Sequence, residues 1–212
     1  MSLELHGYQY SVYGWIARLA LAEKGVDYDW IEVNPFAPDM PKSYLALHPF
    51  KRVPALVHDG FEVYETGAIT RYIDEAFSGP ALQPAGPHDR ARCNQFLSII
   101  DSYAYWPLVR QVFSHRVFRP RLGGPSDTTE IEKGLAAASG VLAALERLVA
   151  DAEFLCGAGI SLADIHLAPM MGYFALAEEG EALLKRHRKL SQWWATMSAR
   201  TNYRATMPRL PG

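Results

Sequence analysis

The sequence predicts two domains of different class, an α/β domain at the N-terminus and an all-α domain after it. Three observations support this division. Up to Phe77 the residue patterns alternate between strand and helix in the order βαβαββα. Prolines then cluster between residues 80 and 87, and every long segment from Asp89 onward has helical spacing. We therefore expect an N-terminal domain at residues 1–78, a linker at residues 79–88 and a helical domain at residues 89–212.

The first two strands are expected to flank a helix. Residues 3–6 alternate apolar and polar side chains, residues 12–24 place apolar side chains at helical spacing, and Gly25 suits the position just after the last helical turn. Residues 28–33 fit a second strand, which a right-handed crossover would place parallel to the first. After a proline-rich break, residues 42–47 are expected to form one or two irregular helical turns.

Residues 48–74 contain a complete run of structural signals. Pro54 stands at the start of an apolar, β-branched strand, where a missing N–H group is tolerated. Asp59-Gly60 supplies a tight hairpin turn, and residues 61–64 alternate as the returning strand. Glu65 and Thr66 then precede apolar residues at helical spacing, which predicts a helix with polar residues at its N-terminus. Such an edge is suited to binding a ligand.

The second half is expected to consist of helices. One long helix should cover residues 89–118 with an interruption at Pro107, because proline removes an internal hydrogen bond. A loop at residues 119–127 and a second long helix at residues 129–150 follow from the Pro/Gly-rich and periodic patterns. Shorter helices are expected at residues 181–187 and 189–200.

Ser161 and Asp164 have the spacing of a capping box, and Ile160 and Ile165 that of a hydrophobic staple. The helix that starts here is almost entirely apolar to about residue 177, so we expect it to be the central buried helix of this domain. His166 lies within it and is expected to be a hydrogen-bonded core residue rather than a ligand.

Composition excludes several classes of protein. A formal net charge of −2 provides no basic field for nucleic acid or for an anionic membrane. The N-terminus lacks the pattern of a signal peptide and no long uncharged apolar window occurs, which favours a cytoplasmic protein. Cys93 and Cys156 are too few for a disulfide framework or a zinc site, so no metal is expected and both are interpreted as buried apolar side chains.

Taken together, these motifs resemble the cytosolic glutathione S-transferase superfamily, and the serine-type, bacterial-like members in particular. The resemblance rests on the motif His-Pro-Phe-x-x-Val-Pro-Ala-Leu at residues 48–56, on Glu-Thr-x-Ala-Ile-x-x-Tyr at residues 65–72, and on the capping box downstream. It covers the whole chain. It implies a thioredoxin-like N-terminal domain followed by an all-helical domain.

The resemblance also implies a glutathione-binding role for six residues. Val53 and Pro54 resemble the family's cis-proline junction, which presents the backbone of Val53 to the cysteinyl backbone of glutathione. Glu65 and Thr66 match the pair that holds the γ-glutamyl group, through a carboxylate and through a hydroxyl at a helix N-terminus. Arg52, and more loosely Lys42, would meet the glycyl carboxylate, although either cation could simply be solvated.

Ser11 is the expected thiol-activating residue, and Tyr13 is the alternative hydroxyl. Ser11 stands at a strand-to-helix turn, where serine-type members have a hydroxyl in place of a thioredoxin-like cysteine. A hydrogen bond and a helix N-terminus that lowered a thiol pKa of about 8.5 by about two units would make the thiolate dominant near pH 7. The absence of cysteine here argues against mixed-disulfide chemistry. The competing interpretation is that Ser11 only caps the helix.

An apolar electrophile is expected to bind at an aromatic cluster beside Pro107. This cluster comprises Tyr103, Tyr105, Trp106, Arg110 and Phe113, with Tyr10 contributed by the loop after the first strand. Helical aromatic residues can equally belong to the core.

The resemblance implies a homodimeric, glutathione-conjugating enzyme of detoxification. Isomerase, dehalogenase or peroxidase chemistry with the same thiolate remains open, and so does a non-catalytic binding protein.

Overall fold

The computed structural model describes residues 2–212 and divides the chain into two compact units. Unit 1 comprises the chain up to Ala81 together with Thr206–Pro208, and unit 2 comprises Leu82–Ala205 and Arg209–Gly212. From the sequence, residues 89–212 were all expected to belong to the helical domain. Thr206–Pro208 instead clusters with the N-terminal unit, where the Thr206 hydroxyl accepts a hydrogen bond from the buried Trp15 indole N–H at 3.1 Å.

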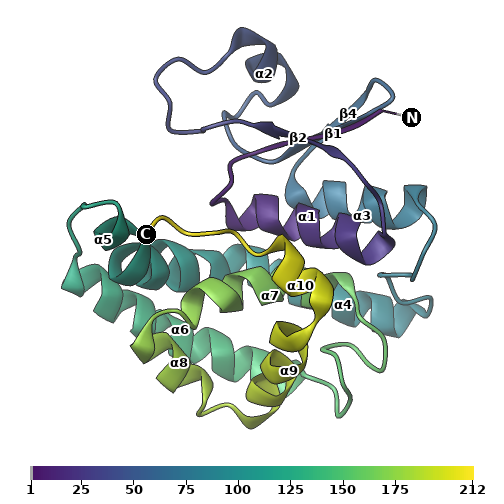
Figure 1. Cartoon of the computed structure of the whole chain (residues 1–212). Helices are drawn as coiled ribbons and strands as arrows, with labels where there is room; N and C mark the ends of the chain where they lie inside the picture. Colours follow the sequence, from purple (N-terminus) through teal and green to yellow (C-terminus); the bar gives the residue numbers. More distant parts are fainter. Residues whose placement is uncertain (1) are drawn as a thin grey trace. The chain divides into compact units, whose positions relative to one another are not determined.

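Unit 1 has the predicted order βαβαββα (Figure 1), which confirms the thioredoxin-like fold. Its elements are β1 (Leu3–Gly7), α1 (Val12–Lys24), β2 (Asp29–Glu32), α2 (Lys42–Leu47), β3 (Ala55–His58), β4 (Phe61–Tyr64) and α3 (Thr66–Ala76).

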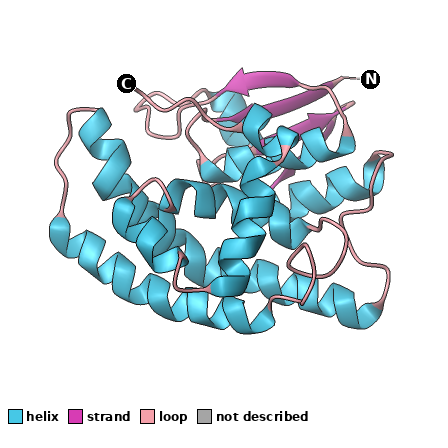
Figure 2. Ribbon diagram, turned by 60° about the horizontal axis from the view of Figure 1, so that its bottom comes forward, coloured by secondary structure: helices cyan, strands magenta, loops and turns pink. Residues whose placement is uncertain are grey.

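The strands of unit 1, magenta in Figure 2, form one mixed sheet in the order β2-β1-β3-β4. β1 is parallel to β2, as expected from the crossover, and antiparallel to β3. Leu5 in the middle of β1 pairs with Trp30 on one side and with Leu56 on the other. α1 and α3 lie side by side against one face of the sheet, and α2 lies by the other (Figure 1). β1, which lies between β2 and β3, and α1 therefore provide most of the buried apolar residues of this unit.

The C-terminal end of α1 is formed as the sequence predicts. Gly25 has φ 65° and donates its N–H group to the carbonyl of Ala22, so the helix ends in a left-handed glycine. Lys24 is buried in the last turn, and its ammonium contacts the Asp74 carboxylate at 3.1 Å and the Pro80 carbonyl at 3.0 Å. Because a buried charge needs partners, this contact fixes the end of α1 to the end of α3.

Unit 2 contains only helices as regular elements in its described residues. They are α4 (Pro87–Ile99), η1 (Ile100–Phe118), α5 (Arg119–Arg121), α6 (Thr128–Leu148), α7 (Leu162–Phe174), α8 (Glu178–Leu184), α9 (Arg188–Ala199) and α10 (Thr201–Thr206), the last of which reaches the segment assigned to unit 1. Within residues 2–212, no helix combines the length and the apolar character needed to cross a membrane.

The long helix around Pro107 differs from the prediction. α4 begins at Pro87 rather than Asp89, because proline is well suited to the first helical position. The chain then continues as the π-helix η1, which contains the buried Pro107 and ends with the Arg119 N–H bonded to the carbonyl of Ser114, five residues back. Helix also persists to Arg121, so the predicted loop starts late. Packing of η1 against α6 and α7 sustains the helix despite the proline.

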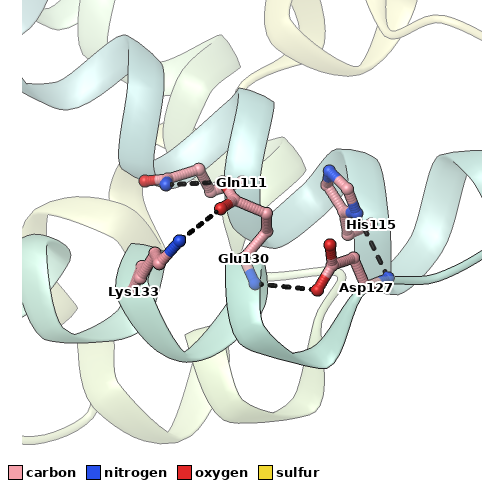
Figure 3. Close-up of polar contacts among 5 residues, drawn as sticks. All are labelled: Gln111, His115, Asp127, Glu130 and Lys133. Carbon is pink, nitrogen blue, oxygen red and sulfur yellow. Dashed lines mark hydrogen bonds and ion pairs between the residues drawn. The ribbon is translucent and has the colours of Figure 1, made fainter.

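Polar contacts join η1 to the first turn of α6 (Figure 3). The Asp127 carboxylate caps α6 by accepting the Glu130 N–H at 3.2 Å, and the Asp127 N–H is donated to Nδ1 of His115, also at 3.2 Å. Glu130 in turn binds the Gln111 amide and the Lys133 ammonium. Burial of His115, followed by the charge of Arg119, lowers the pKa of this imidazole, so it is held neutral as an acceptor.

α7 is the central helix of unit 2, as predicted, and all 13 of its residues are buried. The capping box of Ser161 and Asp164 is present. The Asp164 carboxylate accepts four hydrogen bonds, from the N–H groups of Leu155 and Ser161, the Ser161 hydroxyl and the Trp193 indole, at 2.6–2.9 Å. α7 ends at Phe174, earlier than expected, because the chain turns into α8 at Glu178.

Candidate functional site

The segment between α2 and β3 contains Arg52, Val53 and Pro54, three consecutive residues that were expected to contact the ligand. The Val53–Pro54 peptide bond is cis, as expected. Just before it, the carbonyl of Arg52 accepts a hydrogen bond of 2.6 Å from the phenol of Tyr44 in α2. The Arg52 side chain is exposed, as is that of Lys42 at the start of α2. The backbone is thus held in place while the cations remain available to a ligand.

Tyr44 was missed by the sequence analysis. Its side chain is 4% exposed, and burial raises the pKa of its phenol, so the hydroxyl remains a hydrogen-bond donor at every physiological pH. An apolar stretch predicts the burial of a tyrosine ring in α2, but no local pattern indicates that its hydroxyl reaches the carbonyl of Arg52.

Glu65 and Thr66, the residues expected to hold the γ-glutamyl group, lie at the start of α3. Glu65 has φ 71° and ψ 116°, a conformation that costs a residue with a side chain about 1–3 kcal/mol and that occurs mostly at functional sites. Its carbonyl accepts the N–H groups of Ala68 and Ile69. The N–H groups of Thr66 and Gly67 precede these first helical bonds, so they belong to the donors that a helix N-terminus offers to an anion. The Glu65 side chain is exposed, and that of Thr66 is 6% exposed.

His48 is a further residue of this region that sequence reasoning did not single out. The ring is 2% exposed and stacks at a tilt on Tyr64, with centroids 4.7 Å apart, and its Nδ1 has no hydrogen-bond partner among the described residues. Burial lowers the pKa of His48, against the opposing effect of Glu65. The buried imidazole is therefore held neutral, packed against the ring of Tyr64.

Ser11 occupies the N-cap of α1. It has extended backbone angles, φ −70° and ψ 123°, and its hydroxyl oxygen accepts the N–H of Gly14 at 3.1 Å. The capping role that competed with the catalytic one is therefore present. The two roles are compatible, because a hydroxyl has one donor and two acceptor positions and the cap uses one acceptor. Donation from the helix also polarises the hydroxyl toward giving its own proton.

The tyrosines near Ser11 have different surroundings. Tyr13 and Tyr10 are half-buried, and the Tyr10 ring meets Tyr8 edge to face with centroids 5.3 Å apart. Burial, followed by the charges of Tyr10 and Glu32, raises the pKa of the Tyr8 phenol. Tyr8 is therefore a poor source of a phenolate.

The aromatic residues that were expected to bind the electrophile differ in exposure: two are exposed in unit 2, and one is buried in its core. Tyr103 and Trp106 are 64% and 58% exposed, and the Arg110 guanidinium lies over the Trp106 ring at 5.9 Å. Phe113, in contrast, is buried and stacks on Tyr173 with centroids 4.1 Å apart and ring planes 2° from parallel. Phe113 thus belongs to the core, as the alternative interpretation held, whereas Tyr103 and Trp106 have surface available to a ligand. No group of three or more potential metal ligands occurs among residues 2–212.

Comparison with known proteins matches both halves of the chain to one family. The model of the glutathione S-transferase N-terminal domain matches residues 5–81, and that of the C-terminal domain matches residues 128–195. Glutathione S-transferase F9 of Arabidopsis thaliana is 31% identical over 197 residues, which is 91% of each chain. The chain belongs to the glutathione S-transferase family.

Other members agree with this assignment. Glutathione S-transferase F10 of Arabidopsis thaliana is 29% identical over 89% of this chain and 88% of its own. The solved structure of glutathione S-transferase III in its apo form superimposes with a TM-score of 0.87 at 27% identity, over 100% of this chain and 98% of that one. As a member of the glutathione S-transferase family, the chain is a transferase enzyme.

Proposed function

We propose that this transferase binds glutathione in unit 1, ionises its thiol with the help of Ser11, and attacks an electrophilic carbon of a largely apolar small molecule. The observation that carries the proposal is the start of α3. There the backbone of Glu65 adopts a costly conformation with positive φ at the N-cap of α3. Its carboxylate side chain directly precedes, in the chain, the Thr66 hydroxyl and the N–H donors of the first helical turn. An amino acid carries one ammonium and one carboxylate, and this pair offers one partner for each.

The remaining contacts follow from the same arrangement. The backbone of Val53 would pair with the cysteinyl part of glutathione as a short added strand. Arg52 and Lys42 would face its glycyl carboxylate, since both cations are exposed at this edge. The sulfur would then lie at the N-terminus of α1, where the Ser11 hydroxyl and the helix dipole both stabilise negative charge. Tyr13 is retained as the alternative hydroxyl.

The residues of the electrophile site remain a proposal. Tyr103 and Trp106 offer exposed aromatic surface, and the half-buried Arg110 places its guanidinium over the Trp106 ring. In unit 1, Tyr10 has a half-buried ring. A panel of haloaromatic, epoxide and enone electrophiles together with organic hydroperoxides separates conjugation from isomerase, dehalogenase and peroxidase chemistry. Turnover of the hydroperoxides alone would replace conjugation with peroxidase activity, and no turnover of any compound in the panel would refute conjugation of the proposed electrophile class.

Glutathione binding is tested most directly at Glu65. We expect Glu65→Ala to lose retention on immobilised glutathione and to weaken glutathione binding in calorimetry by at least about tenfold, because the ligand ammonium loses its charged partner. Glu62→Ala is a matched control, since Glu62 is an exposed acid of β4. Circular dichroism establishes that both variants fold. A folded Glu65→Ala protein with unchanged affinity would refute the proposed mode of binding.

The proposal also includes a homodimer, a role in detoxification and a cytoplasmic location, which the resemblance to cytosolic glutathione S-transferases suggests. Light scattering on the protein as it elutes from a size-exclusion column measures the molar mass of the assembly. A monomeric mass at micromolar concentration would refute the proposed dimer.

A further inference from the structure

The carboxylate of Glu32 joins the end of β2 to the turn that carries Ser11. One oxygen accepts the backbone N–H of Gln9 at 3.0 Å, and the other accepts the indole N–H of Trp30 in the same strand at 2.8 Å. Gln9 lies within the turn between β1 and α1, which the Ser11 N–H closes by donating to the Tyr8 carbonyl at 2.8 Å. The carboxylate therefore holds an amide of this turn from a strand residue 23 positions away in the chain.

The Trp30 ring fixes the direction in which this carboxylate points. Trp30 and Glu32 lie two positions apart in β2, so their side chains are on the same face of the sheet. A Cβ atom at Gly7 would come within 2.5 Å of Cη2 of the indole, well inside the roughly 3.5–4.0 Å at which carbon atoms pack. A Cβ at Gly14, in the first turn of α1, would lie 3.6 Å from the same atom, and the Arg18 guanidinium lies over the ring at 5.5 Å. The ring is thus held between β1 and α1, and its N–H orients the carboxylate.

Ser11 is bonded to both the turn and the helix. Its N–H closes the turn, its carbonyl accepts the Trp15 N–H at 2.9 Å, and its hydroxyl oxygen accepts the Gly14 N–H at 3.1 Å. The hydroxyl therefore keeps its direction only while the turn keeps its place at the start of α1. A hydrogen bond weakens steeply away from its best angle, and a misplacement of about 1 Å can cost about a hundredfold in rate.

We propose that Trp30 and Glu32 are positioning residues of the reaction, which hold, through the Gln9 amide, the turn that presents the Ser11 hydroxyl to the glutathione sulfur. This role rests on the proposed function, in which that hydroxyl stabilises the thiolate. A well-placed hydroxyl lowers the pKa of the thiol, whereas the charge of a nearby carboxylate raises it. Positioning by Glu32 and its direct charge effect therefore have opposite signs, and a titration separates them.

Removal of the carboxylate tests this role. Glu32→Ala should raise the pKa of bound glutathione by about 0.5 unit or more, because the Ser11 hydroxyl loses its fixed position. At pH values well below that pKa, kcat for conjugation should fall by about threefold, and the two proteins should converge at high pH. The KM for glutathione should stay within about twofold, since Glu65 and Thr66 are unchanged. Asp29→Ala, which removes an exposed acid of the same strand, is the matched control and should titrate like the wild type.

Two further variants show whether the effect passes through the turn. Glu32→Gln keeps one accepting oxygen and should give a smaller shift than Glu32→Ala. Trp30→Phe keeps a ring but lacks the indole N–H, and it should shift the thiol pKa in the same direction as Glu32→Ala. In the Ser11→Ala background, Glu32→Ala should add no rise in the pKa, because the hydroxyl that it positions is already absent. Hydrogen exchange of the unliganded protein should show faster exchange of the Gln9 and Ser11 amides in both the Glu32→Ala and the Trp30→Phe variants.

The wild type and the variants distinguish failure of the proposed function from failure of the positioning role. A wild-type thiol pKa equal to that of free glutathione would refute activation by Ser11, and the positioning role with it. A lowered wild-type pKa that folded Glu32→Ala leaves unchanged, or lowers further, would overturn the positioning role alone. An equal rise in the Ser11→Ala background, or unchanged exchange of the Gln9 and Ser11 amides, would overturn it as well.

Discussion

Replacement of Ser11 by alanine separates the two functions that its hydroxyl combines. The oxygen caps α1 through the Gly14 N–H at 3.1 Å, and the proton is proposed to be donated to the glutathione sulfur. Loss of an N-cap costs about 1 kcal/mol. For a chain of this length, that loss lowers the midpoint of thermal unfolding by roughly 2–4 °C. The protein should therefore still fold.

The effect on the thiol should be much larger. A hydrogen bond to a charged group contributes about 1.5–3 kcal/mol, and one pKa unit corresponds to about 1.4 kcal/mol, so the pKa of bound glutathione should rise by about one to two units in Ser11→Ala. From a starting value of about 6.5, the thiolate fraction at pH 6.5 falls by about 5- to 50-fold. At pH 9 the thiol is largely ionised in both proteins. The deficit in conjugation rate should accordingly shrink as pH rises.

Ultraviolet titration of bound thiolate measures this pKa directly, and the pH profile of conjugation provides a second readout. Ser11→Thr retains both hydroxyl functions and should behave almost as wild type. Ser11→Asp retains a capping oxygen but has no donor, so it should keep the thermal stability of the wild type and still raise the thiol pKa. If folded Ser11→Ala titrates like the wild type, Ser11 is only a cap, and Tyr13 becomes the candidate for thiolate stabilisation.

Two further predictions concern Tyr44 and His115. Tyr44→Phe removes the 2.6 Å hydrogen bond to the carbonyl of Arg52, so we expect the protein to lose about 1 kcal/mol of stability and glutathione to bind about five- to tenfold more weakly in calorimetry. Unchanged affinity would show that this bond does not position the site. The pKa of His115 is lowered in the folded state, so its contribution to stability is complete above the unfolded pKa of about 6.5 and is lost as pH falls, by at most about 1.4 kcal/mol per pH unit. His115→Asn replaces the imidazole with a non-titrating acceptor. In chemical denaturation from pH 7.5 to 5, the free energy of unfolding of this variant should fall less steeply with falling pH than that of the wild type. An equal slope would exclude His115 as the source of the pH dependence.

The features that the sequence predicted correctly each depend on a pattern of neighbouring residues. The glycine at the end of α1, the Asp59-Gly60 turn with φ 48° and 87°, and the capping box of α7 each depend on residues within four positions of one another. Their geometry is determined by hydrogen bonds between neighbouring residues, so the residue types are sufficient to predict it.

Disagreement occurs where packing overrides a local preference. Pro107 predicts an interruption, yet η1 continues through it because α6 and α7 hold it in place. Phe113 fits a ligand-binding cluster by composition, and only the neighbouring Tyr173 shows that its ring is part of the core. Sequence periodicity cannot distinguish these cases, since it records which face is apolar and not what covers that face.

The sequence by itself determined the family and the order of elements, and its short motifs predict Arg52, Val53, Pro54, Glu65 and Thr66 as ligand contacts, because those motifs are local. Only the tertiary structure decided that Tyr44 supports the carbonyl of Arg52 and that the Trp193 indole binds the Asp164 carboxylate at the start of α7. The contact between Trp193 and Asp164 joins residues 29 positions apart in the chain, and that of Tyr44 depends on where a side-chain hydroxyl points. Both depend on how the elements pack, and no local pattern of residues specifies them.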